Sequence, residues 1–164
     1  MTRQRLELPA AGTCTLVAVR DEADAEFLRQ WKNANREAFF YREVISVSSQ
    51  SEWLHGYLDR DDDYMFLVVE ADVPIGCMGF RLIQDAVDIY NVILGRPELG
   101  GRGLMGDALK CMTAYAWGCY KLPVTARVLT SNPAARWYES NGFRIVGEYE
   151  GYHLLQWCGA QPAI

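Results

Sequence analysis

Hydrophobic and polar positions along the chain follow two different periods, which separate predicted strands from predicted helices. Seven short runs rich in apolar and β-branched residues have the length of strands, and they lie at residues 13–20, 64–70, 74–82, 86–94, 124–129, 143–149 and 153–158. Four other segments carry apolar side chains at helical spacing: residues 21–33, a stretch from about 48, a stretch from the end of loop 95–106 to 120, and residues 132–141. The order β-α-α-β-β-β-α-β-α-β-β predicts an α/β domain on a mixed sheet.

Capping residues predict where the helices begin and end. Asp21 is the expected N-cap of the first helix, and Ser48 or Ser49 of the second. Asn132-Pro133 is expected to open the short helix with proline at its first position, and Asn141-Gly142 to end it with a left-handed cap. The expected buried face of the long helix consists of Met105, Leu109, Met112, Ala116 and Cys119.

Length and charge bound the class of protein. The chain of 164 residues is about one domain's worth, so we predict a single domain over residues 1–164 with its core at about 13–158. Half of the residues are hydrophobic, which excludes a disordered chain. The net charge of −5 argues against a nucleic-acid binder, because that affinity comes largely from clustered lysine and arginine. Cationic or neutral substrates remain open. The charged run 59–63 is expected to be a solvated loop.

Cysteine and histidine usage bears on metal binding and on the cellular compartment. The five cysteines and two histidines contain no C-x-x-C pair, so we expect no metal site. An odd number of cysteines fits reduced thiols, and we expect a cytoplasmic protein. The first residues lack the apolar run of a signal peptide, and no stretch has the length of a membrane span. No membrane association is expected.

The segment 96–109 concentrates four glycines between a predicted strand and a predicted helix. Glycine allows backbone N–H groups to face one point, and a helix N-terminus adds about half a positive charge, so the segment can hold a phosphate. A Walker A loop is excluded because Gly103-Leu104-Met105 stands where G-K-[ST] is needed. The literal G-x-G-x-x-G at 101–106 lacks a following ribose-binding acid, which argues against NAD. A glycine-rich turn without a ligand is the alternative.

Two motifs resemble those of the acyl-CoA N-acyltransferases of the GNAT superfamily. They are the P-E-x-x-G-R-G loop after a strand and the segment N-P-A-A-R-W-Y-E-S-N-G-F at 132–143. The resemblance spans about residues 16–149 and implies a single domain on a mixed, mostly antiparallel sheet that splays at the cofactor strand. The loop departs from the family pattern [QR]-x-x-G-x-[GA] at Gly100, where Gln or Arg is usual, and at Met105, where a small residue is usual.

The resemblance implies acetyl-CoA as co-substrate, with no metal. The thioester arm is expected along the splayed strand and the pyrophosphate on the glycine loop. The residues that match the family's cofactor contacts are Val92, Ile93, Leu94, Gly101, Arg102, Gly103, Leu104, Met105, Gly106 and Asn132. Asn132 can also serve as a plain helix cap.

Tyr138 is the candidate general acid by the same resemblance, because a phenol can protonate the CoA thiolate as it leaves. Asp88 is the candidate general base, ahead of Tyr90 and Glu70, although a water chain can also serve. No Ser-His-Asp set or His-activated cysteine can be assigned, so direct transfer from thioester to amine is the expected mechanism.

The acceptor is expected between the first helices and the central strands, and the candidate substrate-binding residues are Trp31, Asn33 and Tyr90. The pattern W-K-N followed by S-x-x-x-x-W resembles acyltransferases of amino-sugar nucleotides and of protein N-termini. An amino sugar or its nucleotide is favoured as the small-molecule amine, with a protein N-terminus, an amino acid or a polyamine as alternatives. A non-catalytic acyl-CoA-binding module is the alternative of another class. A homodimer is compatible with the exposed strand edges of this fold.

Overall fold

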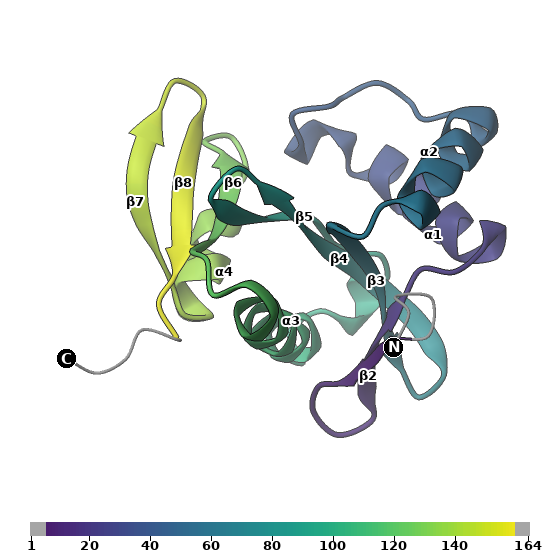
Figure 1. The fold of residues 1–164 in the computed structure, drawn as a ribbon, viewed down its shortest axis with the longest axis horizontal. Coiled ribbons are helices and arrows are strands. Elements are labelled where there is room, and N and C mark those ends of the chain that lie inside the picture. The colour runs from purple at the N-terminus through teal and green to yellow at the C-terminus, as the bar shows by residue number, and fades with distance from the viewer. Residues whose placement is uncertain (1–5, 160–164) are drawn as a thin grey trace.

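The computed structural model describes residues 6–159, so both ends of the predicted domain 1–164 lie outside the described residues. It contains one sheet of eight strands in the order β1-β2-β3-β4-β5-β6-β8-β7 (Figure 1). The strands are β1 (Glu7–Pro9), β2 (Cys14–Ala18), β3 (Asp63–Glu70), β4 (Val73–Ile83), β5 (Ala86–Leu94), β6 (Val124–Leu129), β7 (Phe143–Tyr149) and β8 (Tyr152–Trp157). The helices are α1 (Glu22–Ala34), α2 (Val47–Asp59), α3 (Leu104–Tyr120) and α4 (Ala134–Ser140), with 3-10 turns at Arg36–Ala38 and Pro97–Leu99.

The predicted α/β class and the mixed, mostly antiparallel sheet are confirmed. Neighbouring strands are antiparallel except β5 and β6, which are parallel. All predicted strands and helices are present in the predicted order. Strand β1 was not predicted, because three residues that end in proline carry too little pattern to be recognised as a strand.

Two apolar clusters cover opposite faces of the sheet. Helix α3 packs on one face through Met105, Leu109, Met112 and Ala116, whereas the expected fifth member, Cys119, is exposed. Helices α1 and α2 pack on the other face through a cluster that includes Leu28, Leu54 and Tyr57. Figure 1 shows α3 on one side of the central strands and the α1–α2 pair on the other.

Two of the four predicted caps are confirmed. The side chain of Asp21 accepts a hydrogen bond from the Asp24 N–H, and Gly142, after the C-cap Asn141, has φ +93°. The second helix begins two or three residues earlier than predicted: Ser46, rather than Ser48 or Ser49, is its N-cap. Helix α4 begins at Ala134, so Pro133 is the N-cap and not the first helical residue.

The prediction that run 59–63 is entirely solvated is wrong at its last residue. Asp63 is 6% exposed, because β3 begins there and turns the carboxylate inward. Its Oδ2 accepts a hydrogen bond from Arg60 Nη2 at 2.9 Å, and its Oδ1 accepts one from the Tyr90 hydroxyl. Two donors thus replace the water that this carboxylate loses on burial.

Strands β5 and β6 pair over only three residues and then separate. The pairs are Val87–Val124, Asp88–Thr125 and Ile89–Ala126, which leaves the rest of β5, from Tyr90 to Leu94, without a neighbour on this side. The register between β4 and β5 shifts between Gly79–Tyr90 and Cys77–Ile93, so β5 carries an extra residue there. Asn91, with φ +51°, lies in this bulge. Bulges bend a strand and increase its twist, which accounts for the separation. The predicted splay at the cofactor strand is therefore present.

Candidate active site

Two cavities meet where β5 and β6 separate. The first has a volume of about 430 Å³ and lies between the α1–α2 connection and strands β4, β5 and β6. The second, of about 340 Å³, lies between the end of β5, the glycine loop and the start of α3. Val92, Ala134 and Trp137 line both cavities, so the splay connects them. We call the first the acceptor-side cavity and the second the loop-side cavity.

The loop-side cavity has the features of a phosphate cradle. Gly101 and Gly103 line it at φ +80° and +76°, a conformation that side chains rarely adopt, and a Cβ at either would meet no atom within 4 Å. The open space in front of these two glycines is where a ligand can approach the backbone. Gly103 is also the N-cap of α3 and supplies no side-chain cap, so the first N–H groups of the helix lack an intrahelical partner and can bind an anion.

Most of the predicted cofactor residues line this cavity. They are Val92, Leu94, Gly101, Gly103, Leu104, Met105 and Gly106. Two do not. The side chain of Ile93 is 4% exposed in the core on the α1–α2 side, so only its backbone can face a ligand. The guanidinium of Arg102 is 4.0 Å from the Glu70 carboxylate, and its half-exposed side chain lines neither cavity.

Met105 is accommodated by a glycine on the neighbouring strand. Its side chain is 8% exposed, and a Cβ at Gly76 of β4 would lie 2.9 Å from the Met105 sulfur. Gly76 thus leaves space for a bulky residue at the position where this loop usually has a small one. Gly106 is needed for a similar reason, since a Cβ there would lie 2.5 Å from Oδ1 of Asn141.

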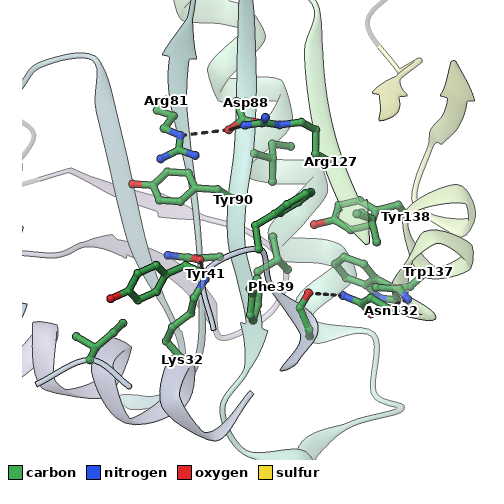
Figure 2. A pocket seen from close by; sticks show the side chains of 18 of the residues that line it. Lys32, Phe39, Tyr41, Arg81, Asp88, Tyr90, Arg127, Asn132, Trp137 and Tyr138 are labelled. Carbon is green, nitrogen blue, oxygen red and sulfur yellow. Dashed lines mark hydrogen bonds and ion pairs between the residues drawn. The ribbon is translucent and has the colours of Figure 1, made fainter. Parts of the chain in front are cut away.

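Tyr138 lies on the wall of the acceptor-side cavity, next to the splay. The residue is 6% exposed, and its ring is fixed edge-on against Trp137 and Phe143, with centroids 5.1 and 5.2 Å away. Its hydroxyl makes no hydrogen bond within residues 6–159, and Figure 2 shows it turned toward the cavity. Burial, with a smaller effect of Asp88, raises the pKa of Tyr138 above that of a free phenol, so the group is protonated at neutral pH.

Asp88 is buried at 5% exposure between two arginines. Its Oδ2 accepts a hydrogen bond from Arg81 Nε at 3.1 Å and lies 3.6 Å from Nη2 of Arg127 (Figure 2). Arg81 is the direct cross-strand partner of Asp88 in the β4–β5 hairpin, which explains their contact. The two ion pairs hold the carboxylate at the cavity wall, and its role as a general base stays a prediction.

Tyr90 and Lys32 complete the polar wall of the acceptor-side cavity. The Tyr90 hydroxyl donates to Asp63, and burial beside that carboxylate raises the pKa of Tyr90. Lys32 Nζ donates to Oδ1 of Asn91 in the bulge and lies 3.7 Å from the centre of the Phe39 ring. Burial lowers the pKa of Lys32 to about 8.

Asn132 lines the acceptor-side cavity and joins two loops there. Its Nδ2 donates to the carbonyl of Ala38 at 3.3 Å, and its Oδ1 accepts from the N–H of Ala134 at 3.0 Å.

Of the three predicted substrate-binding residues, Tyr90 lines the acceptor-side cavity, but Trp31 and Asn33 line neither cavity. The ring of Trp31 packs directly against Gly95, where a Cβ would lie only 2.1 Å from the ring. Asn33 exchanges two hydrogen bonds with the backbone of Ile45, so its side chain fixes a loop.

Sequence reasoning did not assign Arg81, Asn91 or Arg127 to the site. The hairpin register could have indicated Arg81, because it pairs Arg81 directly with Asp88. Nothing in the sequence marks Asn91 as the bulge residue. In the described part of the chain no three His, Cys, Asp or Glu side chains are grouped to hold a metal ion, and no helix there is long and apolar enough to cross a membrane.

Comparisons with solved structures reveal the same fold in several acetyltransferases. The ribosomal L7/L12 α-N-protein acetyltransferase RimL, solved with coenzyme A, is 19% identical, with a TM-score of 0.73 over 92% of this chain and 95% of that one. The spermidine N-acetyltransferase of Vibrio cholerae, solved with CoA and spermine, is 21% identical, with a TM-score of 0.72 over 88% and 92%. A probable GNAT-family acetyltransferase of Chromobacterium violaceum is 17% identical, with a TM-score of 0.70 over 92% and 89%.

No curated protein sequence matches the chain. A family model described as "Acetyltransferase (GNAT) domain" matches residues 14–144, which include both motifs and every wall of the two cavities. The predicted resemblance is confirmed, and with it an acetyltransferase that uses acetyl-CoA as co-substrate. The chain belongs to the GNAT acetyltransferase family.

Proposed function

We propose that the chain transfers an acetyl group from acetyl-CoA to the primary amine of a small molecule, with an amino sugar or its nucleotide favoured, and that Tyr138 is the general acid. The observation that carries the proposal is the position of the free Tyr138 hydroxyl in the acceptor-side cavity, beside the splay. Its neighbour Trp137 lines both cavities, so Tyr138 lies close to the point at which donor and acceptor can meet.

The loop-side cavity fits the diphosphate and the arm of CoA. The uncapped N-terminus of α3 and the open glycines 101 and 103 suit the diphosphate. The unpaired end of β5, from Tyr90 to Leu94, offers backbone groups to an extended amide chain such as pantetheine. When bound, acetyl-CoA supplies the acetyl group and a thiol as leaving group.

Tyr138 suits the role of acid because burial keeps it protonated, and the same burial raises the proton affinity of the thiolate that leaves beside it. The proton that it gives to the leaving sulfur is regained from water in the open cavity, since burial disfavours a lasting tyrosinate. Direct attack by the amine needs no acyl-enzyme. The buried Cys77 supports this, because burial raises the pKa of its thiol to about 12 and keeps it neutral and unreactive.

Asp88 has a positioning role in this scheme, and water serves as the base that removes a proton from the amine. The carboxylate holds Arg81 and Arg127 at the cavity wall. A neutral amine in the cavity needs to lose only one proton after attack, and solvent can accept it through the cavity mouth.

The test is an acetylation assay with a panel of amines. The release of the CoA thiol measures turnover, and mass spectrometry measures the mass of the product. The panel contains glucosamine, its phosphates, a peptide with a free N-terminus, an amino acid and spermidine. Turnover of a primary amine with a mass gain of one acetyl group supports the proposal. Tight binding of acetyl-CoA without turnover of any amine would support a non-catalytic acyl-CoA-binding module instead.

A further inference from the structure

The charge around the acceptor-side cavity is opposite to that of the chain as a whole. The chain has a net charge of −5, yet the described residues that line this cavity include three cations, Lys32, Arg81 and Arg127, and one acid, Asp88. One carboxylate can balance only one of these cations, so the wall retains two positive charges. A cavity lined by one sign of charge concentrates ligands of the opposite sign.

The two arginines meet at a single carboxylate oxygen and keep most of their donors free. Arg81 contacts Oδ2 of Asp88 through Nε, and Arg127 contacts the same atom through Nη2. The remaining nitrogens of both guanidinium groups donate to no acceptor within residues 6–159. Each side chain is 42% exposed, so these nitrogens are open to a ligand. Paired guanidinium groups match the geometry of phosphate and carboxylate.

Aromatic rings and a third cation complete the surroundings. The Arg127 guanidinium lies 5.9 Å from the Phe40 ring centre, and the Arg81 guanidinium 4.3 Å from that of Tyr90. Lys32 and Phe39 form the opposite wall in Figure 2. Flat rings between cations can cover the apolar face of a sugar or a base while the cations bind its acidic group.

We propose that the acceptor is an amine that carries an acidic group, a phosphate or a carboxylate, and that the free nitrogens of Arg81 and Arg127 hold this group. The proposal rests on the function proposed above for the same cavity. It favours a phosphate-bearing amino sugar or an amino-sugar nucleotide. A polyamine such as spermidine has the wrong charge, because each further ammonium would face two unbalanced cations.

The arginine pair is tested by binding before any acceptor is known. The protein is saturated with CoA, and inorganic pyrophosphate is titrated in, with succinate in parallel to separate phosphate from carboxylate chemistry. We expect saturable binding of at least one anion, weakened roughly tenfold or more in Arg127→Gln, where Asp88 keeps its shorter contact to Arg81. Arg144→Gln on the exposed face of β7 removes the same charge outside the cavity and should leave binding unchanged.

No saturable binding of either anion, or equal binding by wild type and Arg127→Gln, would overturn the proposal. Either of these results can be distinguished from a failure of the proposed acetyltransferase function. If CoA does not bind, the acetyltransferase role fails, while the same titration without CoA still tests the arginine pair.

A second test compares matched acceptors in the thiol-release assay. The ratio of kcat/KM for glucosamine 1-phosphate to that for glucosamine is expected to exceed roughly tenfold in wild type and to fall by a similar factor in Arg127→Gln. Spermidine should be the poorest substrate. Efficient acetylation of spermidine, or no preference for the phosphate, would contradict the inference while leaving the acetyltransferase intact. If no sugar is acetylated, the titration with pyrophosphate and succinate decides whether Arg81 and Arg127 bind an acidic group.

Discussion

Lys32 Nζ donates a hydrogen bond to the side-chain oxygen of Asn91, 2.5 Å away, and so ties helix α1 to the bulge of β5. The thiol of Cys77 donates to the backbone carbonyl of the same asparagine at 3.3 Å. Asn91 is thereby held in a left-handed conformation, with φ +51°, at the point where β5 leaves β6. A contact between residues 59 positions apart thus holds the bulge at which the two strands separate.

Substitutions of Asn91 separate the backbone strain from the side-chain contact. Asn91→Gly keeps the positive φ without strain and loses only the bond to Lys32, whereas Asn91→Ala loses the bond and also strains the backbone. We expect Asn91→Ala to be less stable than Asn91→Gly by about 1 kcal/mol, or roughly 2–4 °C in Tm. Equal Tm values for the two variants would show that the bulge does not need the left-handed conformation.

Tyr138→Phe tests the general acid. The change removes one oxygen from a ring that is fixed by Trp137 and Phe143, so the fold and the loop-side cavity should be unaffected. We expect kcat to fall by roughly ten- to a thousandfold, with the Kd for acetyl-CoA unchanged. Tyr149→Phe, at an exposed tyrosine of β7, is the matched control and should retain full activity. An unchanged kcat in Tyr138→Phe would exclude the acid role.

Trp31→Ala tests whether Trp31 stabilises the fold or binds the acceptor. Because its ring lies against Gly95 and Phe27 and lines neither cavity, Trp31→Ala should lower the free energy of unfolding by about 2–3 kcal/mol. The KM for the acceptor amine should stay within about twofold of wild type, since no ligand contact is lost. Thermal unfolding and steady-state kinetics check the two effects. A raised KM in a protein of unchanged stability would restore the original substrate-binding interpretation.

The charge of Lys32 predicts a pH dependence of acceptor preference. Burial lowers the pKa of Lys32 to about 8, an effect that Arg81 increases and Cys77 opposes, with Asn91 and the Phe39 ring as its other neighbours. Below pH 8 the ammonium attracts an acidic acceptor, and above pH 8 that attraction is lost. The kcat/KM ratio of an acidic acceptor to its neutral counterpart should therefore fall from pH 7 to pH 9.

Lys32→Met should make that ratio nearly independent of pH over the same range, because the titrating charge is gone. The comparison of wild type with Lys32→Met cancels the deprotonation of the acceptor amines, because the same two acceptors are used with both proteins. A ratio that is flat in wild type, or equally steep in Lys32→Met, would show that Lys32 does not act on the acceptor.

The sequence predicted the fold and the loop-side cavity well, because both depend on local patterns. Short runs of apolar and β-branched residues indicated the strands, and Gly101 and Gly103 line the loop-side cavity as the motif predicted. The acceptor side was predicted less well. Trp31 lies on the face of α1 toward Gly95, and only the tertiary packing decides this. Arg127 reaches Asp88 through the pairing of β5 with β6, strands that are far apart in the chain.

The predicted role of Asp88 illustrates the same limit. The sequence places a carboxylate on the cofactor strand but does not show which residues contact it. In the structure Arg81 and Arg127 occupy it, so its chemistry is set by residues that the strand's own sequence does not include.

Isothermal titration of the protein with acetyl-CoA, with NADH as a control ligand, measures whether acetyl-CoA binds on the glycine loop. Gly103→Ala places a methyl group in the open cradle at φ +76°, and Gly151→Ala places one at φ +86° in a distant turn, where it also meets nothing within 4 Å. We expect micromolar binding of acetyl-CoA but not of NADH, a loss of affinity of roughly tenfold or more in Gly103→Ala, and wild-type affinity in Gly151→Ala. No binding of acetyl-CoA, or equal affinity in wild type and Gly103→Ala, would contradict this expectation.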